Sequence, residues 1–221
     1  MKLLLKLGAD RVAAQARKFG FAQGVFAYPT LALGTAEATV VENVAAFNVF
    51  ANHGKYVHPY FVEWVKDGQG KKLWQHTGKQ QQLIDPLVCD KMVRALQVRM
   101  ELAKKQSKDG WFEGESIGKS GSTNGAATTW FVGATPDLTT AVYLGRDDNK
   151  PMGKMVFASK TAYPIWLALY RELTCRKQRF YLDPRLENVV INWLTGEVAM
   201  PNENGVYDAH AITLLKERDV R

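Results

Sequence analysis

The middle of the sequence contains the string GKSGSTN at residues 118–124 and, after a short loop, the string WFVGATPDL at residues 130–138. Apolar and polar residues alternate with a period of two in this region, which is typical of half-buried strands. The pattern predicts one strand over 116–122 and a hairpin formed by 128–135 and 138–145. Because strands joined by turns this short pair side by side, the sequence predicts an antiparallel meander.

Helix signals flank this meander on both sides. Residues 3–19 have helical spacing, although no capping residue precedes them. Thr39 and Glu42 fit a capping box for a second helix, which Gly54 ends, and Asp85-Pro86 opens a third. The string TAYP at 161–164 opens a last helix. The spacing predicts these inward-facing residues: Leu4, Val12, Ala13 and Ala16; Val40, Val44, Phe47 and Ala51; Val88, Met92, Leu96 and Met100; Ile165, Trp166, Leu169 and Leu173.

Two further strand pairs are predicted outside the meander. Residues 60–65 and 72–75 flank the turn string DGQG, which is a hairpin signal. Residues 189–193 and 197–200 flank Thr195-Gly196 in the same way. Most of the helices precede the antiparallel meander and the last one follows it. This order predicts an α+β fold, with an antiparallel sheet and helices packed against it.

The composition is that of a globular protein. The 221 residues are 46% hydrophobic and 23% charged, and this length suits one ordinary domain or two very small ones. Although 29 Lys and Arg against 22 Asp and Glu give a net charge of +7, the basic residues are scattered, so we expect no nucleic-acid partner. No stretch approaches the roughly 18 apolar residues of a membrane span, and no targeting signal opens the chain. Cys89, Cys175 and the dispersed histidines lack metal-ligand spacing, so we expect no metal and no cofactor.

Three chemistries compete for the polar segment 114–124. A phosphate-binding loop needs four residues between its glycines and then a helix, whereas Gly114 and Gly118 have three between them and a strand follows. A serine–lysine nucleophile pair at Ser116 and Lys119 needs a helix, because on a strand the two side chains point to opposite faces. The third interpretation, Lys119-Ser120-Gly121 as a Lys-(Thr/Ser)-Gly strand, agrees with the predicted meander.

The segment 118–148 closely resembles class A penicillin-binding proteins. Their pattern runs Gly-Lys-Thr-Gly-Thr-Thr-Asn, a short loop, and then Trp-Phe-Val-Gly-Tyr-Thr-Pro-Asp-Leu. Similar strings occur elsewhere in the chain: LALG at 31–34, FANHG at 50–54, LIDP at 83–86 and YPIW at 163–166. The resemblance assigns 1–174 to the C-terminal portion of the transpeptidase domain. It leaves 175–221 as a C-terminal extension that contains the predicted strand pair.

This resemblance implies a partial β-lactamase/transpeptidase-like fold and a peptidoglycan cross-linking activity. In the family, the serine of a Ser-x-x-Lys motif is acylated by a stem peptide or a β-lactam, beside Ser-x-Asn and Lys-Thr-Gly motifs. By resemblance Lys119 is the catalytic residue of the third motif and faces the substrate carboxylate. Ser120, Gly121, Ser122 and Thr123 bind substrate, and the N–H of Ser122 forms half of an oxyanion hole. The resemblance also implies the cell envelope as location, periplasmic or at the outer face of the inner membrane.

The other two motifs are missing upstream, because residues 1–106 contain no serine. From the resemblance we therefore expect the back half of a transpeptidase domain, without a nucleophile and inactive alone. Its expected partners are stem peptides, β-lactams and a separate polypeptide carrying the front half. Whether the chain is an enzyme stays open. The alternative is a non-catalytic module that kept the site strand in order to bind a peptide or a partner subunit.

Overall fold

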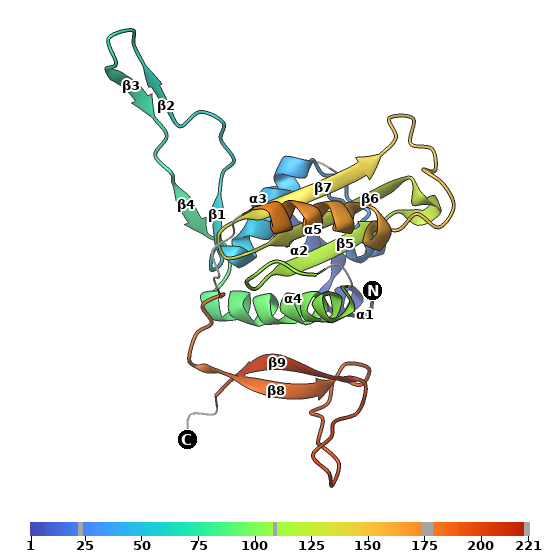
Figure 1. Ribbon diagram of the computed structural model, residues 1–221. Helices are drawn as coiled ribbons and strands as arrows, with labels where there is room; N and C mark the ends of the chain where they lie inside the picture. Colours follow the sequence, from blue (N-terminus) through green and yellow to red (C-terminus); the bar gives the residue numbers. More distant parts are fainter. Residues whose placement is uncertain (22–23, 108–109, 174–178, 219–221) are drawn as a thin grey trace.

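A three-stranded antiparallel sheet lies at the centre of the computed structural model, which describes residues 1–21, 24–107, 110–173 and 179–218 (Figure 1). Its strands lie side by side in chain order: β5 (Ile117–Ser122), β6 (Thr128–Ala134) and β7 (Thr139–Gly145). Both pairs are antiparallel, and the N–H of Thr135 donates to the carbonyl of Leu138 at the turn between β6 and β7. The predicted meander is therefore confirmed.

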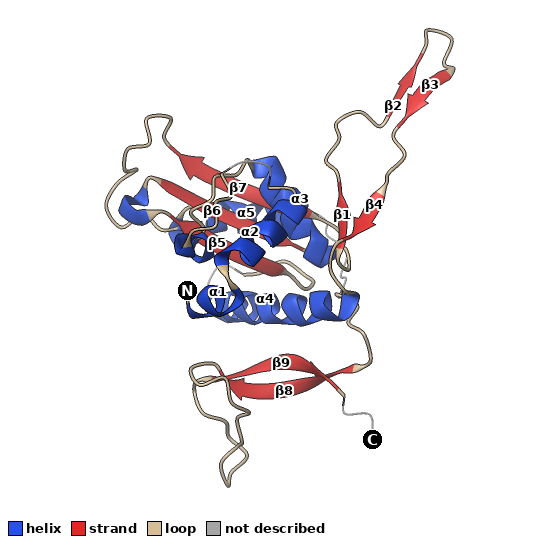
Figure 2. Cartoon of the chain, turned by 180° about the vertical axis from the view of Figure 1, so that it is seen from behind, coloured by secondary structure: helices blue, strands red, loops and turns tan. Residues whose placement is uncertain are grey.

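Helix α5 (Ala162–Glu172) covers one face of this sheet (Figures 1 and 2). Trp166 and Tyr170 are fully buried there and stack with ring centroids 4.2 Å apart. A Cβ atom on Gly133 would lie 2.6 Å from the Trp166 ring, so the helix approaches β6 closely only because that position is glycine. Trp166 points inward as predicted, but Ile165 and Leu169 are exposed. The buried residues of the helix are Ala162, Trp166, Leu167 and Tyr170.

The starts of the next two helices are as predicted. Helix α3 (Val40–Ala51) begins with a capping box, in which Thr39 Oγ1 accepts from the N–H of Glu42 and the Glu42 carboxylate accepts from the N–H of Thr39. Helix α4 (Pro86–Gln106) begins where the Asp85 carboxylate accepts from the N–H of Leu87. Both signals are local in sequence, which is why the sequence predicts them correctly.

The buried side of α4 is rotated relative to the predicted one. Val88 and Met92 are exposed, whereas Cys89 and Val93 are buried against Ile117 of β5. The helix lies between the sheet and the C-terminal strand pair (Figure 1), so two neighbours decide which residues are covered. In full, the buried residues of α4 are Cys89, Asp90, Val93, Gln97 and Met100, and those of α3 are Ala45, Ala46 and Val49.

The single helix predicted over 3–19 is two helices, α1 (Lys2–Leu7) and α2 (Ala9–Lys18). Gly8 separates them with a φ of 89°, a left-handed value at which an α-helix cannot continue. Leu4 and Ala13 are buried as predicted. Within the described part of the chain, no helix is both long enough and apolar enough to span a bilayer.

A long two-part hairpin projects from the body of the molecule (Figure 1). At its base β1 (Lys55–Val57) pairs with β4 (Gln80–Gln82), and beyond them β2 (Trp64–Lys66) pairs with β3 (Lys72–Gln75). The outer pair is the predicted hairpin, with a first strand that begins later than expected. The inner pair was not predicted, since three successive glutamines carry no apolar alternation.

The C-terminal strand pair is only partly as predicted. β8 (Leu186–Asn192) pairs along its whole length with β9 (Ala211–Glu217) and not with 197–200. The turn at Thr195-Gly196 does bring Val198 to Ile191, but only as an isolated bridge. The distant strand is the regular partner because it matches all of β8 and also packs on α4. The division of the chain after residue 174 stays a prediction, since that boundary and Cys175 lie outside the described residues.

Candidate active site on strand β5

The predicted site residues occupy the second half of β5 and the position that follows it. Ile117 and Gly118 at the start of the strand are buried, whereas Lys119, Gly121 and Ser122 are exposed. Within the described residues β5 is an edge strand, because β6 is its only neighbour in the sheet. The structure thus presents the Lys-Ser-Gly tripeptide on an uncovered strand edge.

The register shows which backbone groups are free at this edge. In antiparallel pairing, the N–H and C=O groups of alternate residues point to the partner strand, and those of the residues between point away. The N–H of Thr123 donates to the carbonyl of Thr128 at 3.0 Å, which continues the β5–β6 ladder. It follows that the backbone groups of Ser120 and Ser122 face outward.

The Lys119 ammonium group lies at the same edge. Its Nζ atom donates to the outward-facing carbonyl of Ser120 at 2.6 Å. A positive charge therefore lies near the exposed N–H groups of the strand. Such a combination suits a ligand with a carboxylate and an extended peptide backbone, because charged groups make the stronger hydrogen bonds and a strand edge can pair with a peptide.

Two glycines of β5 serve different purposes. A Cβ atom on Gly118 would lie 2.7 Å from both Met100 Sδ and Phe131 Cζ, so internal packing requires glycine there. A Cβ atom on Gly121 would lie 3.6 Å from Trp130 Cβ, which is an ordinary contact. Internal packing therefore does not require a glycine at position 121. The absence of a side chain there leaves space on the exposed part of the strand.

The hydroxyl groups of Ser122 and Thr123 already have partners. Ser122 Oγ accepts from the N–H of Ala158 at 2.9 Å, and Thr123 Oγ1 accepts from the N–H of Thr128 at 2.8 Å. The first bond joins the strand to a 3₁₀ turn at Ala158–Lys160. No pattern in the sequence predicts this turn or its position near the site. The backbone N–H of Ser122, rather than its hydroxyl, is left facing the edge.

The rival chemistries do not fit this geometry. Residues 117–122 form a strand, and the element directly after it is a 3₁₀ turn at Asn124–Ala126 rather than an α-helix, so the segment is not a phosphate-binding loop. Ser116 is 5% exposed while Lys119 is exposed, so the two do not form a nucleophile pair. Burial raises the pKa of the Cys89 thiol to about 12, so it is protonated at neutral pH and unreactive.

The remaining candidates are structural. His53 lies on the surface, with Nδ1 3.8 Å from Asp90 Oδ1. Glu115 is half-buried, and its carboxylate accepts from Gln97 Nε2 and the N–H of Phe180. In the described ranges, no group of three or more His, Cys, Asp or Glu side chains is arranged to hold a metal ion.

The comparisons with known proteins identify the family of this chain. The family model described as the penicillin binding protein transpeptidase domain matches residues 1–166. This chain belongs to that family. Penicillin-binding protein 1A of Aquifex aeolicus is 31% identical over 208 residues, which are 92% of this chain and 28% of that protein. The protein of the same name from Neisseria lactamica is 33% identical over 179 residues, covering 77% of this chain and 22% of the relative. The chain thus spans about a quarter of the length of these relatives.

Solved structures of penicillin-binding proteins have the same fold. Penicillin-binding protein 1A of Haemophilus influenzae superposes with a TM-score of 0.79 at 24% identity, over 96% of this chain and 37% of that one. Penicillin-binding protein A of Mycobacterium tuberculosis, solved as an imipenem acyl-enzyme complex, has a TM-score of 0.53 at 21% identity, over 76% and 44%. The expected transpeptidase-like α+β fold is confirmed.

Proposed function

We propose that this chain supplies the Lys-Ser-Gly strand of a D,D-transpeptidase site that cross-links peptidoglycan stem peptides and reacts with β-lactams. The nucleophilic serine comes from residues outside these 221. The observation that carries the proposal is the exposed edge of β5, where the Lys119 ammonium group donates to the carbonyl of Ser120. The site lies in the cell envelope, on the periplasmic side, where stem peptides are found.

In this reaction the serine Oγ attacks the carbonyl carbon before the terminal D-alanine, and D-alanine leaves as the ester forms. An amine of a second stem peptide then attacks the ester, which forms the cross-link and frees the serine. The stem peptide lies along β5 as an added strand. Lys119 and Ser120 hold its carboxylate, Gly121 leaves room for its backbone, and the N–H of Ser122 stabilises the oxyanion.

This chain offers two surfaces to the polypeptide that carries the nucleophile. The outer edge of β7 has no neighbour in the described sheet, so a further strand can pair there. Leu3, Leu5 and Leu7 of α1 are exposed apolar side chains that a further polypeptide can cover. A polypeptide that pairs with β7 and covers α1 would bring its serine to the sheet that contains Lys119.

A hybrid protein tests the proposal. It joins the nucleophile-bearing part of the Aquifex aeolicus relative to residues 1–221, and fluorescent penicillin labels it covalently. We expect no labelling of residues 1–221 alone, labelling of the hybrid, and a loss of about 10²-fold or more in labelling rate in the hybrid with Lys119→Ala. Lys154→Ala, in an exposed turn, is the matched control and leaves the rate unchanged. Labelling of the lone chain, or a folded, labelled hybrid indifferent to Lys119→Ala, contradicts the proposal.

A second candidate function is a non-catalytic module that binds a stem peptide at the β5 edge. The observation in its favour is that no helix in the described residues carries a serine with a lysine one turn later. Titration of residues 1–221 with a synthetic pentapeptide, followed by NMR, distinguishes the two. Shifts confined to β5 in the lone chain, together with an unlabelled hybrid of proven fold, favour the binding module.

A further inference from the structure

Two exposed apolar surfaces lie at opposite ends of the molecule. The first, here called the arm hairpin, is residues 60–76 around β2 and β3. The second, here called the acidic loop, is residues 193–208 between β8 and β9. Figures 1 and 2 show the arm hairpin projecting from one end of the molecule and the acidic loop hanging from the other. The exposed apolar residues are Tyr60, Phe61, Val62, Trp64, Val65, Leu73 and Trp74 in the arm hairpin, and Trp193, Leu194, Val198, Met200, Val206 and Tyr207 in the acidic loop.

The arm hairpin has apolar side chains on both faces. Val65 and Trp74 are cross-strand partners on one face, and Trp64 opposes Gln75 on the other. Every residue of β2 and β3 is exposed, and Phe61 just before them is 91% exposed. A lone two-stranded hairpin is marginally stable in water, and an exposed apolar surface of this kind marks an interaction site.

The two surfaces carry opposite charges. The arm hairpin contains Lys66, Lys71 and Lys72 against Glu63 and Asp67, and Lys55 and Lys79 flank it at its base. Asp67 is engaged in the turn, where its carboxylate accepts from the N–H groups of Gln69 and Lys71. The acidic loop contains Glu197, Glu203 and Asp208 and no lysine or arginine, and the Asp208 carboxylate accepts from the N–H of His210. Each surface therefore offers the apolar area and the charge that complement the other.

We propose that the acidic loop of one copy of this chain docks on the arm hairpin of a second copy. The two surfaces cannot meet within one molecule, because they lie at opposite ends of it (Figures 1 and 2). The contact is head to tail, so the copy at each end of the assembly keeps one unused surface. Contacts of this type produce open chains, or rings if the rotation between copies closes.

The charges favour this occupant over an anionic lipid surface. The tip of the arm hairpin is the polar string KDGQGKK at 66–72, and the apolar side chains lie behind it. Inserting that tip into hydrocarbon is costly, because charged side chains are expensive there. A protein loop with its own exposed Trp193, Leu194 and Met200 can instead pack along the stem of the hairpin while its carboxylates meet the lysines.

Charge reversal tests the contact. Residues 1–221 are examined by sedimentation velocity over a range of concentrations at low and high salt. We expect assembly that grows with concentration, weakens with salt and weakens about tenfold in Kd for Lys71→Glu with Lys72→Glu, and equally for Glu197→Lys with Glu203→Lys. Mixing the two double variants restores assembly. Lys150→Glu with Lys154→Glu, in an exposed turn away from both surfaces, is the matched control.

A second pair of variants tests the head-to-tail geometry. Trp64→Ser with Trp74→Ser disables the arm hairpin, and Leu194→Ser with Met200→Ser disables the acidic loop. Each variant alone is expected to be a monomer, and an equimolar mixture is expected to stop at a dimer. A wild-type chain that stays monomeric at every concentration overturns the proposal, and so does assembly indifferent to charge reversal. Binding to phosphatidylglycerol vesicles that Lys71→Glu with Lys72→Glu abolishes, without self-assembly, assigns the arm hairpin to lipid instead.

Discussion

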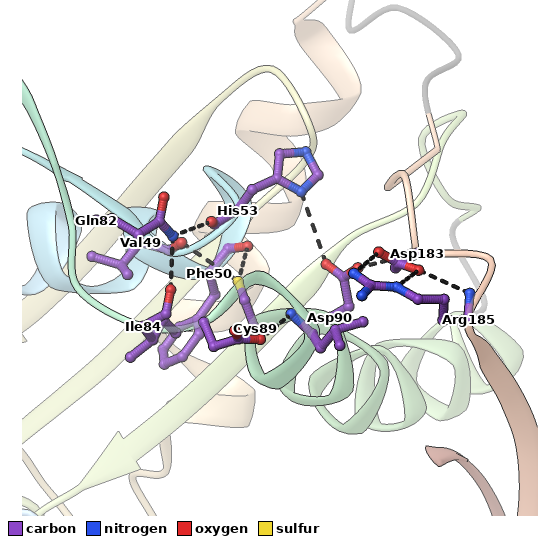
Figure 3. Close-up of polar contacts among 11 residues, drawn as sticks. Val49, Phe50, His53, Gln82, Ile84, Cys89, Asp90, Asp183 and Arg185 are labelled. Atoms are coloured by element: carbon purple, nitrogen blue, oxygen red, sulfur yellow. Dashed lines mark hydrogen bonds and ion pairs between the residues drawn. The ribbon is translucent and has the colours of Figure 1, made fainter. Parts of the chain in front are cut away.

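Asp90 Oδ2 accepts a hydrogen bond of 2.8 Å from the backbone N–H of Asp183 (Figure 3). The bond joins α4 to the segment that leads into β8, across 93 positions of the chain. The Asp90 side chain is 4% exposed, and this burial raises the pKa of its carboxyl group above the usual value. His53 approaches the same carboxylate from the end of α3, so three segments meet at Asp90.

Removing the Asp90 carboxylate should loosen this junction. Asp90→Ala leaves the partly buried N–H of Asp183 without its acceptor, which we expect to cost about 1 kcal/mol in the free energy of unfolding. Asp90→Asn keeps an acceptor oxygen and removes a buried charge, so it should be as stable as the wild type or more stable at pH 7. Urea unfolding of both variants measures this. Equal destabilisation by Ala and Asn would show that the charge, and not the acceptor, holds the junction.

The pH dependence of that comparison has a definite sign. Because the folded-state pKa of Asp90 is raised, its contribution to stability is complete below the unfolded pKa of about 3.9 and is lost as pH rises through the folded pKa. The stability of Asp90→Asn relative to the wild type should therefore increase from pH 4 to pH 7. A constant difference over this range would contradict the raised pKa.

Asp183 should behave in the opposite way. The Arg185 guanidinium beside it lowers the pKa of the Asp183 carboxyl to about 2. Its contribution to stability is therefore present above about pH 3.9 and is lost as pH falls toward 2. Asp183→Asn should flatten the fall in urea midpoint between these pH values. A variant that loses stability in acid as steeply as the wild type would show that the ion pair does not stabilise the fold.

Three glycine-to-alanine variants separate packing from function in the sheet. Gly118→Ala and Gly133→Ala place a methyl group against Met100 and Trp166, respectively, so each should lower the free energy of unfolding by about 1–3 kcal/mol. Gly121→Ala should keep the melting temperature of the wild type. In the penicillin-labelled hybrid it should nevertheless lower the labelling rate, because the methyl group lies on the proposed substrate strand. A labelling rate unchanged by Gly121→Ala would mean that the ligand does not approach that position.

The capping box of α3 gives a stability prediction independent of the site. Thr39→Ala removes the side-chain acceptor for the N–H of Glu42, and we expect it to cost about 1 kcal/mol. Thr77→Ala, in an exposed loop, is the matched control. Thermal and urea unfolding check both variants, and equal stability of the two would show that the cap contributes nothing to the folded protein.

The sequence alone determined the features that depend on near neighbours. The meander β5–β7 follows from alternation and a turn within about thirty residues, and the caps at Thr39 and Asp85 follow from contacts within three positions. The Lys-Ser-Gly tripeptide was located through the resemblance of residues 118–148 to a family motif, which also lies within one stretch of the chain. The folded structure agrees with these local patterns because the hydrogen-bonding groups and side chains involved are close together in the chain.

Only the tertiary structure decided the features that depend on distant segments. The buried sides of α4 and α5 and the choice of β9 as partner of β8 were decided by packing, which competes with local pattern and overrides it. At the site, the register with β6 determines that the N–H of Ser122 faces outward, and Ala158, 36 positions away, takes the Ser122 hydroxyl. No sequence pattern within β5 specifies the direction of the Ser122 N–H or the partner of the Ser122 hydroxyl. Both features depend on backbone groups that folding brings from elsewhere in the chain.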